Sequence, residues 1–232
     1  KAAELYQLAA EQGNASAQYC LGGMYNTGEG ISQNYETAIK WTRLSAEQGF
    51  AYAQFNLGSH YYHGLGVSQD FKEALKWYQL SVKQGNELAQ FNLGIMHSEG
   101  QGVPQDYDQA IKFYRLAAEQ GFVNAQYKLG MMYSKGQVQH DYDEAIKWFR
   151  LAAEQGDVAA KSQLDLLLEL EETLEKAKSA FVAEDYKSAF EIWKPLAEKG
   201  NAKAQNNFGL MYKEGKGVPQ DYKEAVKWYR FA

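Results

Sequence analysis

The sequence has little of several features that define particular classes of protein. Its single cysteine, Cys20, excludes an intrachain disulfide framework. No run of 18 apolar residues occurs, so the sequence predicts no membrane insertion. Lys and Arg number 24 against 29 Asp and Glu, a net charge of −5. This mild acidity argues against a nucleic-acid partner, because nucleic-acid-binding surfaces are normally basic.

Internal repetition dominates the sequence instead. Glycines recur at intervals of 35 or 36 residues, at Gly13, Gly49, Gly85, Gly121 and Gly156, and Gly200 follows after 44 residues. Each interval predicts a first helix, a glycine-rich turn and a second helix, since apolar residues recur with helical spacing. Such helix pairs cannot bury their apolar faces alone. They must stack on one another, which predicts an all-α superhelix of antiparallel helix pairs with about 36 residues per repeat.

Residues repeated at fixed positions predict how the units pack. Small residues in the first helix let a neighbouring helix approach closely, at Gly22, Gly58, Gly94, Gly130 and Gly209. Large residues in the second helix are expected to fill the space between helices, at Trp41, Trp77, Phe113, Trp148 and Trp228. Polar residues that precede the second helix are expected to cap it, at Asn34, Asp70, Asp106, Asp141 and Asp221.

The repeated motifs resemble those of a known family. They read A-x-A-Q-x-x-L-G-x-x-Y, then G-x-G-V-x-Q-D-Y, then A-x-K-W-x-x-x-A-A-E-Q-G. This pattern is similar to the Sel-one-like repeat family, a relative of the tetratricopeptide repeat with slightly longer units. The resemblance implies a right-handed α-solenoid. It also implies a scaffold for protein–protein contacts, of a kind common in bacterial signalling and host-interacting proteins.

The pattern breaks at residues 157–199, where no G-x-G turn follows. We expect residues 1–170 to form a repeat array that ends in a cap-like helix. Residues 171–232 are expected to form a tetratricopeptide-like pair followed by a truncated repeat. Pro195 inside the second helix of that pair is expected to kink it. Two alternatives stay open at the junction, namely two short arrays joined together or two segments merged into one long helix.

Both chain ends fall inside second-helix segments, so we expect a fragment of a longer repeat array. These ends would expose apolar faces, which makes self-association through them a further expectation. The sequence leaves the compartment open between cytoplasm, periplasm and the extracellular space.

Candidate chemical sites are few. His60 and His63 stand at i, i+3, but no third ligand at a suitable spacing accompanies them, so no metal site is predicted. The G-x-G turns lack the strand and the Lys-Ser/Thr continuation of a phosphate-binding loop, so no cofactor is predicted. His140 is expected in a solvated turn. No catalytic arrangement stands out, and the sequence predicts a protein that is not an enzyme.

The first-helix surface is the more promising candidate. Positions that vary between repeats form a polar column on the concave face, with candidate partner-binding residues Tyr52, Asn56, Asn92, Asn124, Lys128, Lys203 and Asn207. An aromatic row lies beside it, at Tyr19, Phe55, Phe91 and Tyr127. That row either supplies binding contacts or packs between repeats.

The resulting hypothesis is a scaffold that binds a protein or peptide along this face. A cell-wall-related hydrolase or accessory protein, and a structural, engineered or permuted solenoid, are the alternatives.

Overall fold

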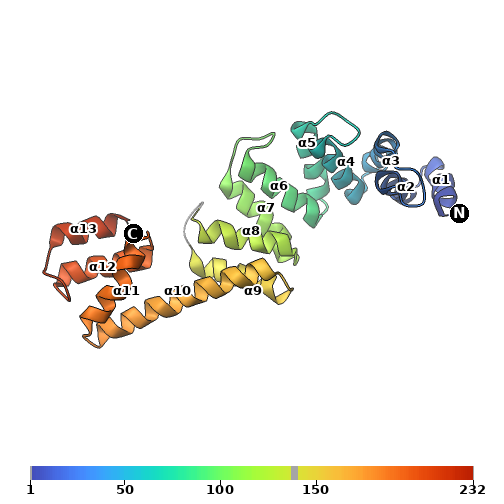
Figure 1. Cartoon of the computed structure of the whole chain (residues 1–232). Helices are drawn as coiled ribbons and strands as arrows, with labels where there is room; N and C mark the ends of the chain where they lie inside the picture. Colours follow the sequence, from blue (N-terminus) through green and yellow to red (C-terminus); the bar gives the residue numbers. More distant parts are fainter. Residues whose placement is uncertain (1, 137–140, 232) are drawn as a thin grey trace. The chain divides into compact units, whose positions relative to one another are not determined.

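The computed structural model describes residues 2–136 and 141–231 (Figure 1). These residues form thirteen α-helices and no strand. The helices are α1 Ala2–Glu11, α2 Ala15–Thr27, α3 Tyr35–Glu47, α4 Ala51–His63, α5 Phe71–Val82, α6 Glu87–Glu99, α7 Tyr107–Glu119, α8 Val123–Ser134, α9 Tyr142–Glu154, α10 Val158–Val182, α11 Tyr186–Glu198, α12 Ala202–Glu214 and α13 Tyr222–Phe231. None of these described helices is long and apolar enough to cross a membrane. His140 lies outside the described residues.

The chain divides into two compact units, Lys1–Ala160 and Lys161–Ala232. In the first unit, α1 is followed by the helix pairs α2–α3, α4–α5, α6–α7 and α8–α9, which succeed one another along the chain (Figure 1). Each helix contacts the next one in sequence. The predicted all-α solenoid of stacked helix pairs is therefore confirmed.

Local capping sets where the helices begin and end. The Asp106 carboxylate accepts a hydrogen bond from the Gln109 backbone N–H at 2.9 Å, and Asp70 accepts from the N–H groups of Lys72 and Glu73. At the end of α4, Gly64 adopts a left-handed conformation (φ 69°), which glycine tolerates because it has no Cβ. The predicted caps are confirmed at these positions.

The first-helix glycines bring the second helix of the same repeat into direct contact. A Cβ atom built on Gly58 would lie 2.7 Å from the Tyr78 ring, and one on Gly94 would lie 2.5 Å from the Tyr114 ring. These rings are almost completely buried. Trp77 is also buried, as expected, but the ring at the next position lies deeper. The repeat core is thus built around an aromatic ring seated on a glycine.

A buried glutamine links successive repeats. Gln54 is 5% exposed, and its side-chain amide donates to the carbonyl oxygen of Ala46. Its own oxygen accepts from Gln84, which follows the second helix of the same repeat. Gln126 makes the same pair of bonds, with the Ala118 carbonyl and Gln155. The buried side chain of the A-x-A-Q glutamine is therefore hydrogen-bonded through both its amide and its oxygen, as buried polar groups usually are.

The second unit has its own core. Trp193, Ala177 and Ala189 are buried together, and the rings of Phe181 and Tyr186 lie 5.3 Å apart. All five residues come from the segment that breaks the repeat pattern, and four of them, all except Trp193, are the packing positions expected for a tetratricopeptide-like pair. Pro195 lies within α11.

The junction is a continuous helix. Residues Val158–Val182 form one α-helix of 25 residues, which corresponds to the alternative in which the two segments merge. The division between the two compact units falls between Ala160 and Lys161, within this helix. The assignment of residues 1–170 and 171–232 to separate arrays stays a prediction.

Candidate functional site

The candidate residues lie on first helices in both units. We call the surface of α2, α4, α6 and α8 that carries Tyr52, Asn56, Asn92, Asn124 and Lys128 the first-helix face. Tyr52, Asn124 and Lys128 are exposed, whereas Asn56 and Asn92 are half-buried. Lys203 and Asn207 belong to α12 of the second unit, where Lys203 is exposed and Asn207 half-buried. Five of the predicted residues therefore share one compact unit.

Two of the asparagines already have partners within the chain. The Asn92 amide donates to the carbonyl oxygen of Leu88 on its own helix, at 3.0 Å. Asn56 is hydrogen-bonded to the Tyr19 phenol, although burial is the larger influence and raises the pKa of Tyr19. An asparagine side chain has two donors and an acceptor, so each retains further hydrogen-bonding capacity.

Hollows lie between successive first helices of the first unit. A cavity of about 360 Å³ between α6 and α8 is lined by Lys128, Glu99 and Tyr127, among others. A smaller one of about 80 Å³ lies between α2 and α4 and is lined by Asn56 and His60, among others. Two of the predicted residues therefore border cavities rather than flat surface.

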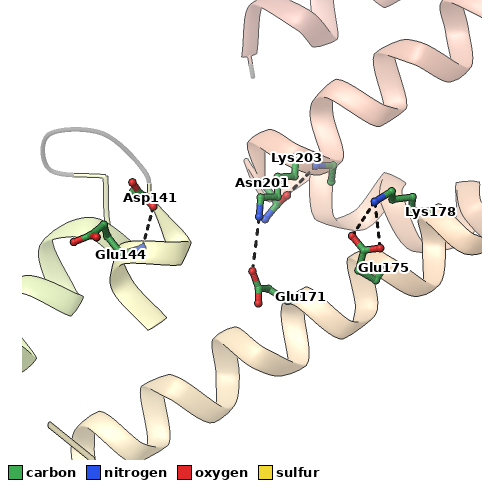
Figure 2. A network of polar contacts seen from close by, with 8 residues as sticks. Asp141, Glu144, Glu171, Glu175, Lys178, Asn201 and Lys203 are labelled. Atoms are coloured by element: carbon green, nitrogen blue, oxygen red, sulfur yellow. Dashed lines mark hydrogen bonds and ion pairs between the residues drawn. The ribbon is translucent and has the colours of Figure 1, made fainter. Parts of the chain in front are cut away.

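The second unit has a comparable hollow of about 330 Å³ between α10 and α12. Lys203 and Asn207 line it, together with Glu175 and Lys178. The Lys203 ammonium lies 3.8 Å from the Glu171 carboxylate, and Lys178 lies 3.3 Å from Glu175 (Figure 2). These exposed ion pairs contribute little to stability, but they give this hollow charges of both signs.

The aromatic row packs against other rings, both within a repeat and between successive repeats. Phe55 stacks on Tyr78 with ring centroids 5.8 Å apart, and Phe91 lies 5.1 Å from Phe122. Tyr127 likewise lies 5.8 Å from Phe149. Of the two interpretations that the sequence left open, the structure supports packing.

Tyr52 differs from that row. It is 47% exposed, yet its ring lies 6.4 Å from Tyr19 and 6.2 Å from Phe50. These neighbours restrict the side chain, so an exposed aromatic surface is held in place at little entropic cost on binding.

The histidines lie in separate surroundings. His60 is 4% exposed, and burial lowers its pKa despite a 2.9 Å hydrogen bond to the Leu65 carbonyl. His97 stacks on Phe113, and burial lowers its pKa as well. His63 is exposed beside Tyr62. Among the described residues, no group of three or more His, Cys, Asp or Glu side chains is placed to hold a metal ion.

The fold and this surface define the class of protein. Stacked helix pairs, most of them with a ring seated on a glycine, form an α-solenoid repeat protein. The family model of the Sel1 repeat matches this sequence at residues 1–14, 15–50, 51–86, 88–122, 123–157 and 202–232. The chain belongs to the Sel1 repeat family, as its motifs suggested.

Solved structures agree with this assignment. The chain is 35% identical to c5321, described as a protective antigen of uropathogenic Escherichia coli with an SLR fold, over 99% of this chain and 48% of that one, with a TM-score of 0.67. It is 32% identical to a Sel1 repeat protein from Oxalobacter formigenes, over 95% of this chain and 85% of that one, with a TM-score of 0.61. The chain thus spans about half the length of c5321. No curated protein matches it.

Sequence reasoning missed two residues that shape the cavity between α2 and α4. Thr42 and Asn26 both line it. A signal was available, because Thr42 stands where the other units have Tyr78, Tyr114, Phe149 or Tyr229. The change from an aromatic ring to a small hydroxyl at a core position predicts space.

Proposed function

We propose that this chain is a non-catalytic scaffold that binds another protein, through an extended peptide segment, along the first-helix face of its first unit. The observation that carries the proposal is the pair of cavities that Asn56 and Lys128 border. Neither residue belongs to the repeated core, so the fold does not require them.

The chemistry of the face suits a polypeptide main chain. Asn56, Asn92 and Asn124 each offer amide donors and an acceptor that match peptide N–H and C=O groups. Tyr52 adds an exposed ring, and Lys128 adds a positive charge. Aromatic anchors surrounded by polar contacts are typical of binding hot spots. Lys203 and Asn207 are proposed as a further contact on the second unit.

The relatives support a bacterial role facing a host. The two relatives described above both come from bacteria, and c5321 is described as a protective antigen. Sel1 repeats are generally scaffolds rather than catalysts, which supports a protein without enzymatic activity. A host-interaction role predicts that partners recovered by this chain include host proteins.

Selection from a displayed library of random peptides, with the purified chain as bait, tests the proposal. We expect the wild-type chain to enrich a defined peptide motif. Replacing Asn56, Asn92 and Lys128 together by alanine should weaken binding of the selected peptides by about tenfold or more.

A matched variant changes three exposed lysines on second helices, Lys40→Ala, Lys76→Ala and Lys112→Ala. It removes more charge than the first variant but leaves the first-helix face intact. We expect it to bind like the wild type. Equal binding by all three proteins, or loss only in the second-helix variant, would contradict the proposal.

A further inference from the structure

The cavity of about 80 Å³ lies within the first unit and is walled by three helices. Gly22, Gly23 and Asn26 of α2 form one wall, Thr42 of α3 forms the second, and Asn56 and His60 of α4 form the third. It is open on one side. Because Asn56 belongs to the first-helix face, the cavity borders the surface proposed to bind a peptide.

Comparison between repeats explains why the cavity exists. In the other units, a ring from the second helix lies against the first-helix glycine. The distances from a Cβ on that glycine to the ring are 2.7 Å at Gly58, 2.5 Å at Gly94 and 2.6 Å at Gly130. Gly22 instead faces Thr42. The cavity therefore lies where the ring of Tyr78 or Tyr114 lies in the next repeats.

The hydroxyl groups of those tyrosines have partners on their own first helix. The Tyr78 hydroxyl is hydrogen-bonded to Ser59, and the Tyr114 hydroxyl lies 3.3 Å from Oγ of Ser98. Asn26 occupies the position in α2 that Ser98 occupies in α6. Its Oδ1 is buried and has no hydrogen-bond partner among the described residues, so the Asn26 amide has to rotate before this oxygen can meet a group in the cavity. A buried acceptor without a hydrogen bond destabilises the folded chain, so this wall of the cavity favours an occupant that donates a hydrogen bond.

His60 gives the same cavity a second polar wall. The other units have a methionine at this position, namely Met24, Met96, Met132 and Met211. The Leu65 carbonyl can only accept, so Nδ1 of His60 carries the proton and Nε2 is left as an acceptor. Burial lowers the pKa of His60, which keeps the ring neutral at neutral pH. The described lining residues then carry no charge, so a cationic occupant would be unpaired.

We propose that this cavity receives the phenol ring of a tyrosine side chain from the bound polypeptide, with its hydroxyl donating to Oδ1 of Asn26. The proposal rests on the proposed function and specifies it. A cavity of about 150 Å³ admits benzene, so this one holds the hydroxyl end of the ring. The rest of the ring lies in the open mouth beside Asn56. The occupant thus reproduces, from outside, the contact that Tyr114 makes within its own repeat.

Small probes test the cavity without knowledge of the partner. NMR titrations of the full chain would follow the signals of Thr42 and Leu65 with p-cresol, toluene and methylguanidinium. We expect p-cresol to bind about tenfold more tightly than toluene, which corresponds to one hydrogen bond to a buried acceptor. Asn26→Leu should remove this preference. Thr42→Tyr should fill the cavity, abolish p-cresol binding and raise the melting temperature.

A matched control, Ser32→Tyr, adds the same side chain at an exposed turn and should bind p-cresol like the wild type. Equal affinity for toluene and p-cresol, preferential binding of methylguanidinium, or no binding of any probe would overturn the proposal. So would unchanged p-cresol binding in Thr42→Tyr. If Thr42→Tyr fails to fold, the proposal is still tested by the ratio of the p-cresol and toluene affinities in the wild type and by its loss in Asn26→Leu.

The proposal for the cavity and the proposal for the first-helix face can be contradicted independently. If the cavity proposal is wrong but the face is right, probes do not bind, yet the Asn56, Asn92 and Lys128 variant still loses the selected peptides. If the face is wrong, that variant keeps the peptides whatever the probes do. If both are right, the selected peptides contain a tyrosine, and Thr42→Tyr removes the enrichment of that tyrosine.

Discussion

Gln84 donates a hydrogen bond from its side-chain amide to Oε1 of Gln54, with the two atoms 2.9 Å apart. The Gln54 amide in turn donates to the carbonyl oxygen of Ala46, at 3.2 Å. One buried side chain of α4 therefore joins α3 to the turn after α5, across two successive repeats. The contact between Gln54 and Ala46 is buried, whereas Gln84 itself is exposed to solvent.

The variant Gln54→Leu is expected to destabilise the chain by about 1–3 kcal/mol. Leucine has a similar volume, so the loss reflects the two hydrogen bonds that the Gln54 side chain makes rather than a cavity. Native-state hydrogen exchange of the α4 amides measures the change in the free energy of local unfolding.

Gln205 provides an internal control. Its amide donates to the Ala197 carbonyl at 3.0 Å, but its buried Oε1 has no partner among the described residues. Gln205→Leu breaks one hydrogen bond instead of two and removes an unsatisfied acceptor. The exchange of α12 amides should therefore accelerate less than that of α4 amides in Gln54→Leu. Equal losses of local stability in Gln54→Leu and Gln205→Leu would show that the hydrogen bond from Gln84 contributes nothing to stability.

The variant Gly94→Ala is expected to destabilise the first unit by about 1–3 kcal/mol, the usual cost of overpacking. The added Cβ would lie 2.5 Å from the buried Tyr114 ring, which must then shift. This outweighs the roughly 1 kcal/mol that alanine gains over glycine within a helix. Chemical denaturation followed by tryptophan fluorescence measures the difference.

The variant Gly23→Ala separates the effect of helix propensity from the effect of side-chain packing. Gly23 also lies inside a helix, but a Cβ there would meet no described atom within 4 Å. We expect a gain of about 0.5–1 kcal/mol from reduced backbone entropy of the unfolded chain. A loss at Gly23, or a gain at Gly94, would contradict the packing argument.

The repeat architecture could be predicted because the same local signals recur in every unit. Asp106 caps a helix through its own backbone neighbours, and Gly64 needs only its own φ angle, so both follow from nearby sequence. How deeply an aromatic ring is buried depends on the packing of three helices together. Sequence reasoning therefore assigned the core to Trp77, whereas Tyr78, one position later, is the more deeply buried.

The candidate site was predictable only in part for the same reason. Comparison between units identified Asn56 and Lys128 as positions that the fold does not repeat, and the structure places both beside cavities. The role of Asn26 depends on a contact across helices: its acceptor is unsatisfied because Thr42 replaces a tyrosine on the facing helix. Spacing within one helix cannot reveal that relationship. The continuous helix through Lys161 was likewise one of two alternatives that the local pattern left open, and not the one that the sequence favoured.

The variant His60→Met should make the chain less sensitive to acid. Burial lowers the folded-state pKa of His60 below its ordinary value of 6.5, with His63 as a neighbouring titratable group. The unfolded state therefore binds the proton more readily, so stability is full above about pH 6.5 and falls as the pH drops below it. Methionine, which the other repeats have at this position, removes that contribution.

Melting temperatures measured from pH 7.5 down to pH 5 check this expectation. The fall in melting temperature should be smaller in His60→Met than in the wild type. It should not vanish, because burial also lowers the pKa of His97. The exposed residue His63 supplies the control variant His63→Met, which should retain the acid dependence. An identical pH profile for His60→Met and the wild type would contradict the argument.

The variant Tyr52→Ala should separate binding from stability. Its ring is 47% exposed but is held near Tyr19 and Phe50, so truncation removes contact surface from the face and little from the core. We expect affinity for the selected peptides to fall by about tenfold, while the free energy of unfolding changes by less than about 1 kcal/mol. Tyr222→Ala, at a 64% exposed ring of the second unit, is the matched control and should bind like the wild type. Calorimetric titration of one selected peptide into the three proteins measures this, and unchanged affinity in Tyr52→Ala would remove this residue from the binding face.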